Sequence, residues 1–69
     1  MIRLIEVKKN AVLFKRWYYI EKEGEPRKEI RKEISNAIFN SMVLTHSERV
    51  QTSEATTTTM YMKEKTNVS

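Results

Sequence analysis

Residues 11–22, AVLFKRWYYIEK, decide the fold class of this chain. The stretch is rich in β-branched and aromatic side chains, which are typical of strands. Its even positions hold Val12, Phe14, Arg16, Tyr18 and Ile20. Because side chains alternate between the two faces of a sheet, we predict that the even positions face the core, with Arg16 as the one misfit.

The odd positions of the same strand point to the opposite face of the sheet, away from the predicted core. They hold Leu13, Lys15, Trp17 and Tyr19. Since Trp and Tyr are enriched among the residues that dominate protein interfaces, we expect these four residues to form a partner-binding surface. The alternative is structural: Trp17 covers one end of a small core, because tryptophan is buried on average.

The segments that flank this strand predict a hairpin and a helix. Residues 2–8, upstream, are rich in Ile, Leu and Val, and the Lys9-Asn10 pair suits a tight hairpin turn. Downstream, Gly24 and Pro26 mark one break, because they are the only glycine and proline in the chain. From Pro26 to residues 40–43, apolar side chains recur at three- and four-residue intervals, which predicts a helix.

The last third of the chain predicts a second hairpin. Residues 47–52 form a weak extended run, Ser53-Glu54 suits a turn, and Thr56–Met62 favours a strand because the threonine side chain is crowded in a helix. The predicted architecture is therefore α+β, with one helix packed on a small antiparallel sheet in the order β-β-α-β-β. We expect one domain over residues 1–65 and a frayed tail over residues 66–69.

The predicted core is small for a stable monomer. It consists of Ile2, Leu4, Val12, Phe14, Tyr18, Ile20, Ile30, Ile34, Ile38, Met42, Met60 and Met62. A chain of this length buries only about 60% of its surface on folding. We therefore expect a homodimer, in which sheet edges pair between chains or an apolar surface is covered.

The distribution of charge supports an alternative to protein binding. The net charge is +4, and residues 1–20 alone carry five basic groups and one acidic group. The basic residues near the first hairpin are Arg3, Lys8, Lys9, Lys15 and Arg16. Such a patch could bind nucleic-acid phosphates, with Trp17 and Tyr19 stacking on bases. The predicted helix carries balanced charges, which makes it a poor track for phosphates.

The sequence holds little equipment for catalysis. It has no cysteine or aspartate, and its single histidine lies in His46-Ser47-Glu48. Neighbours in an extended run point to opposite faces, whereas a catalytic triad converges in space from separate elements. One glycine cannot build a phosphate-binding loop. We expect no enzymatic activity and no catalytic, cofactor or metal site.

These patterns together predict a small basic binding module. We expect a protein-binding inhibitor or adaptor, of the kind common among accessory proteins of phages and mobile elements, with nucleic-acid binding as the alternative. The absence of cysteine, of a signal-like N-terminus and of a long apolar run favours a cytoplasmic protein with no membrane contact.

Overall fold

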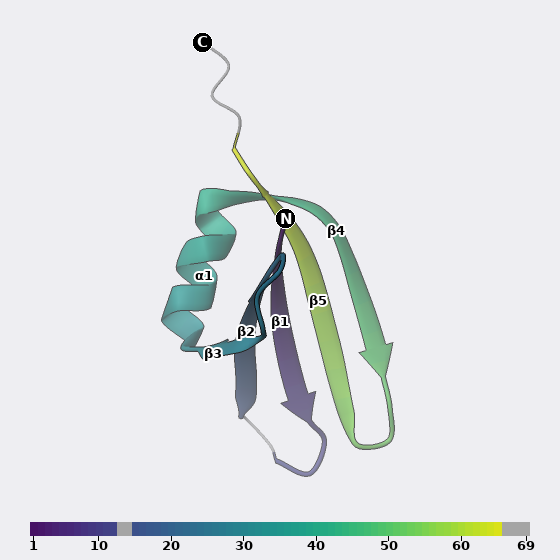
Figure 1. The fold of residues 1–69 in the computed structure, drawn as a ribbon. Coiled ribbons are helices and arrows are strands. Elements are labelled where there is room, and N and C mark those ends of the chain that lie inside the picture. Colours follow the sequence, from purple (N-terminus) through teal and green to yellow (C-terminus); the bar gives the residue numbers. More distant parts are fainter. Residues whose placement is uncertain (13–14, 66–69) are drawn as a thin grey trace.

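Five strands and one helix make up the part of the chain that the computed structural model describes, residues 1–12 and 15–65 (Figure 1). The elements are β1 (Ile2–Lys9), β2 (Arg16–Lys22), β3 (Lys28–Ile30), α1 (Lys32–Ser41), β4 (Met42–Gln51) and β5 (Ala55–Glu64). All strand pairs are antiparallel. The predicted α+β class and the β-β-α-β-β order are confirmed, with β3 as an additional short strand. Leu13, Phe14 and the predicted tail 66–69 lie outside the described residues.

The first strand of the chain lies at the centre of the sheet. The strand order is β3-β2-β1-β5-β4, so β1 pairs with a strand from each hairpin. Leu4 lies opposite Ile20 of β2 and opposite Met60 of β5. Both hairpins therefore depend on β1, which supplies the middle of the core.

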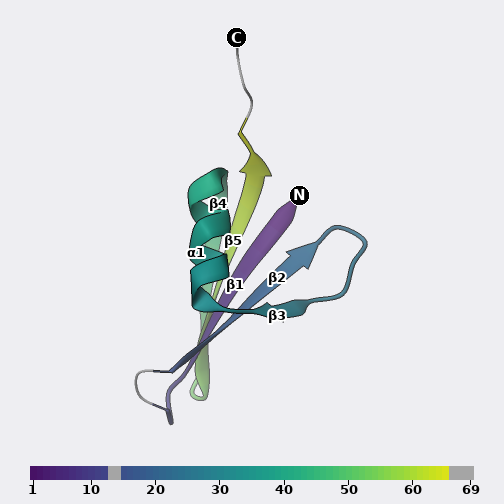
Figure 2. The same ribbon diagram turned by 90° about the vertical axis from the view of Figure 1, so that its left-hand side faces the viewer.

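The helix covers one face of the sheet, as Figure 2 shows. Leu4 and Met62 are fully buried on that face. Ile2, Tyr18, Ile20, Ile30, Ile38, Met42 and Met60 are partly buried. These nine agree with the predicted core, whereas Val12 and Ile34 are exposed and Phe14 lies outside the described residues.

The predicted start of the helix at Pro26 is wrong. Residues Lys28–Ile30 instead form β3, in which Ile30 lies opposite Tyr18 of β2. The helix begins only at Lys32, and Ser35 is its one buried residue, with Ile38 partly buried beside it. Ile34 is consequently 47% exposed, because the neighbouring position carries the contact with the sheet.

The first hairpin is more open than predicted, since β2 begins at Arg16 rather than at Ala11. The pairing of β1 with β2 ends at Lys8 and Arg16, Lys9 remains in β1, and Val12 is exposed in the connection that follows. Asn10 holds this connection to the second hairpin. Its side-chain amide donates hydrogen bonds to the carbonyls of Thr52 (3.3 Å) and Ser53 (3.0 Å).

Replacement of Asn10 by alanine is expected to lower the free energy of unfolding by about 1 kcal/mol, because both carbonyls lose a side-chain donor. Urea denaturation measures the effect. Asn36→Ala is the matched control: this exposed side chain lies within α1, where alanine is a better helix former. Equal stability of Asn10→Ala and the unmodified protein would show that the two turns are held by backbone contacts alone.

The second hairpin has longer strands than predicted, with the predicted turn confirmed. β4 follows α1 directly at Met42, and Thr52, Ser53 and Glu54 connect it to β5. A bulge interrupts the register between Leu44 and His46. The hydroxyl of Thr45, the extra residue, donates a hydrogen bond to the carbonyl of Tyr61 (2.9 Å). No helix among the described residues has the length and apolar character to cross a membrane.

Candidate functional site

The face of the sheet opposite α1, here called the open face, carries two of the three aromatic residues of β2, Trp17 and Tyr19. The strand register sets its composition: Trp17 lies opposite Val7 of β1, and Tyr19 lies opposite Ile5. Ile5 is only 2% exposed, although the helix lies on the other side of the sheet. The open face therefore has a small apolar centre of its own, which the predicted core did not include.

Two lysines lie over the indole ring of Trp17. The ammonium nitrogen of Lys9 is 4.7 Å from the ring centroid, and that of Lys15 is 5.2 Å away. Trp17 itself is partly buried. Each such cation–π contact contributes about 0.5–1 kcal/mol at an exposed site, so the lysines and the ring hold one another in place. Neither lysine forms an ion pair within residues 1–12 and 15–65.

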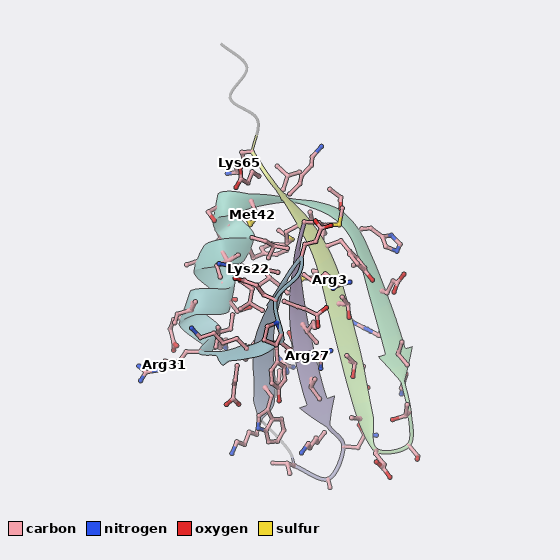
Figure 3. All side chains as sticks on the ribbon, in the orientation of Figure 1. Arg3, Lys22, Arg27, Arg31, Met42 and Lys65 are labelled. Atoms are coloured by element: carbon pink, nitrogen blue, oxygen red, sulfur yellow. The ribbon has the colours of Figure 1, made fainter. Side chains whose placement is uncertain are left out.

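Tyr19 lies beside a second group of charges. The guanidinium carbon of Arg27 is 5.5 Å from the Tyr19 ring centroid. The Glu21 carboxylate forms ion pairs with Arg3 and, at 3.7 Å, with Arg27, and Figure 3 shows the positions of the two arginines. Glu29 of β3 lies opposite Tyr19, so this end of the open face carries two arginines and two glutamates, and the excess of positive charge on this face lies around Trp17.

The β4 side of the open face is mixed in charge. His46 Nε2 lies 3.2 Å from a Glu48 carboxylate oxygen, and the Tyr61 hydroxyl donates to the other oxygen at 3.4 Å. Ser47 pairs with Met60 and so lies on the helix side, opposite to His46. The described residues contain no group of three or more His, Cys, Asp or Glu side chains that could hold a metal ion.

The structure brings most of the predicted partner-binding residues together. Lys15, Trp17 and Tyr19 lie on one continuous surface of the open face, while Leu13 lies outside the described residues. The predicted partner-binding set did not contain Lys9, which was assigned only to the nucleic-acid alternative, and no predicted site included Arg27. Lys9 reaches Trp17 only through the pairing of β1 with β2, and Arg27 reaches Tyr19 only because β3 is a strand.

The five residues of the nucleic-acid alternative are divided between the two faces. Lys8 and Arg16 lie opposite each other on the helix side, whereas Arg3 and Lys9 lie on the open face with Lys15. Two of the five are already paired with acids. Arg3 binds Glu21, and Arg16 lies 3.4 Å from Glu6.

A hollow of about 1040 Å³ lies on the helix side, between α1 and β3. Its apolar lining comes from Ile20, Ile30, Ile34 and Ile38. Its rim combines glutamates with lysines and arginines, including Arg31, which extends away from the sheet in Figure 3. The charged residues of this lining are Lys22, Arg27, Lys28 and Arg31 against Glu25 and Glu29, and no aromatic side chain lies among the described residues of the lining.

No protein-family model, curated protein or solved structure matches the chain. Register, exposure and charge on the open face are therefore the observations that bear on function.

Proposed function

We propose that the chain is a non-enzymatic, cytoplasmic protein-binding domain of the inhibitor or adaptor type, and that its open face binds an acidic surface of a partner protein. The observation that carries the proposal is the position of Trp17: partly exposed, on the face that the helix leaves free, between Lys9 and Lys15. An aromatic anchor with cations around it suits a partner that combines apolar contact with carboxylates.

Protein binding is favoured over nucleic-acid binding for two reasons. Phosphate binding needs several free cations along one track, and here the basic residues of the first hairpin are divided between two faces. Base stacking needs a free ring face, and two ammonium groups already lie over Trp17. Carboxylates of a partner could instead bind those same ammonium groups while the ring edge and Tyr19 make apolar contact.

Adjacent lysines on opposite faces provide a test of this proposal. The partner is first captured from native lysate with the tagged protein, with and without nuclease, and its affinity is then measured by titration. Lys9→Glu is expected to weaken binding about tenfold, because it places a negative charge beside Trp17. Lys8→Glu makes the same charge change on the helix side and is expected to leave the affinity unchanged.

The two lysine variants also separate the two functional classes. If the domain bound nucleic acid through the tip of the hairpin, both variants would weaken binding, nuclease would abolish capture and affinity would fall steeply with salt. Equal losses for Lys8→Glu and Lys9→Glu would contradict the assignment of the open face as the binding surface.

A further inference from the structure

The outer edge of β4 is the longest unpaired strand edge in the described part of the chain. β4 is the last strand in the sheet order, and its ladder runs only to β5. In Figure 1 no other element lies beyond it. Its outward N–H and C=O groups form a template for a further strand. The opposite edge, β3, has only three residues and offers little room for pairing.

The side chains of β4 do not protect this edge. All of its residues except Met42 are exposed, and the strand contains no proline and only two charged residues besides its histidine. Three of the exposed side chains are apolar: Val43 and Leu44 near its start, and Val50, 59% exposed, near its end. An exposed edge of this length with apolar side chains at both ends is typical of a pairing surface rather than of a blocked edge.

We propose that the occupant of this edge is a second copy of the chain, paired antiparallel through β4 with Ser47 on the two-fold axis. A two-fold axis normal to the sheet keeps the two open faces on the same side. Because directly opposed residues of antiparallel strands must share a face, the axis has to pass between the two copies of one and the same residue. Thr45 is the extra residue of the bulge, so it is left out when positions along β4 are counted from the axis. Centring on Ser47 then sets His46 opposite Glu48 of the second copy, and Val43 opposite Val50.

The neighbouring symmetric registers are less favourable. Centring on Glu48 places two carboxylates directly opposite each other, and centring on Arg49 does the same with two guanidinium groups. Centring on His46 sets Glu48 opposite the apolar Val43. The Ser47 register alone among these four sets His46 opposite Glu48 and Val43 opposite Val50, and it also sets Leu44 opposite Arg49, whose aliphatic stem can pack against the leucine.

The pairing of two β4 strands does not depend on the proposed function, but it would change how the open face meets a partner. The two open faces would lie on the same side of a ten-stranded sheet, and both helices would lie on the other side. The dimer would then present two copies of Trp17 to one partner surface. It would also extend a sheet in which only Leu4, Ile5 and Met62 are buried apolar residues among those described.

A single cysteine tests the register, because the chain has none of its own. Directly opposed residues of antiparallel strands lie about 4.5–5.5 Å apart between Cα atoms, within the range for a disulfide. Ser47→Cys is therefore expected to form a covalent dimer rapidly under mild oxidation. Arg49→Cys is the control, since its two copies would lie roughly 13 Å apart along the strands. Cross-linking no faster for Ser47→Cys than for Arg49→Cys would overturn the register.

Sedimentation equilibrium tests the pairing without a cross-link. The unmodified protein is expected to sediment with twice the 8.2 kDa of the monomer. Val50→Lys is expected to raise the dimer dissociation constant at least about tenfold, because it removes both Val43–Val50 pairs and adds two cations. A monomer at every concentration, a dimer insensitive to Val50→Lys, or a foreign strand bound to β4 would overturn the proposal. Failure here leaves the affinity of the monomer for its partner, and its loss in Lys9→Glu, unaffected.

Discussion

Replacing Leu4 with alanine is expected to lower the free energy of unfolding by about 3 kcal/mol. Leu4 is fully buried in the central strand, between Ile20 and Met60, so its truncation leaves a cavity that neither hairpin can fill without moving β1. A small domain has a total stability of only about 5–15 kcal/mol, and at this size the lower end applies. The variant is therefore expected to retain only about 2 kcal/mol, which leaves a few per cent of the molecules unfolded at 25 °C.

Urea denaturation followed by Trp17 fluorescence and by circular dichroism measures this loss. Ile34→Ala is the matched control, because it removes an aliphatic side chain that is 47% exposed on α1. Its cost is expected to stay below about 1 kcal/mol. Equal losses for the two variants would mean that α1 packs through Ile34, contrary to the structure.

Replacing Trp17 with alanine is expected to weaken binding of the partner roughly 30- to 1000-fold, which corresponds to about 2–4 kcal/mol. Trp17 has the largest side chain on the open face, and it holds Lys9 and Lys15 in position. Its loss would remove the apolar anchor and release both lysines, so the effect would exceed that of either charge reversal. Isothermal titration with the purified partner measures it.

Phe39→Ala serves as the control for the tryptophan variant. Phe39 is an exposed aromatic residue on α1, away from the open face. Its replacement is expected to leave the affinity within about twofold of the unmodified protein, which corresponds to less than 0.5 kcal/mol. Thermal denaturation of both variants shows whether the fold is retained. A loss of affinity in Phe39→Ala as large as that in Trp17→Ala would transfer the binding surface to the helix side.

The parts of the fold that local patterns determine could be predicted from the sequence. Alternation in residues 16–22 placed Trp17 and Tyr19 on one face and Tyr18 and Ile20 on the other, and the register confirms this division. The threonine run at Thr56–Thr59 lies in β5, as its crowded side chains require. These features depend on neighbours within a few residues, which a sequence displays directly.

The features that depend on distant partners could not be predicted. Residues Lys28–Ile30 have a helical pattern of apolar and charged positions, but pairing of Ile30 with Tyr18 makes them a strand. Asn10 suits a tight turn on local grounds, yet it bonds to residues more than forty positions away. Nothing near these residues in the sequence records such contacts.

The same limit applies to the candidate site. The sequence pattern predicted three residues of this surface, because Trp17 and Tyr19 lie in one strand and Lys15 directly precedes it. Lys9 and Arg27 complete the surface from other segments, and each depends on a register that tertiary pairing sets. The charge around Trp17 therefore became visible only once the pairing of β1, β2 and β3 was known.

Acrylamide quenching of Trp17 fluorescence, in the free protein and in the saturated complex, tests the open face most directly. The chain contains one tryptophan, so its emission reports this ring alone. Ready quenching is expected in the free protein, because the ring is only partly buried, and the quenching constant is expected to drop several-fold when the partner covers it. The same constant in both states would mean that the partner binds elsewhere.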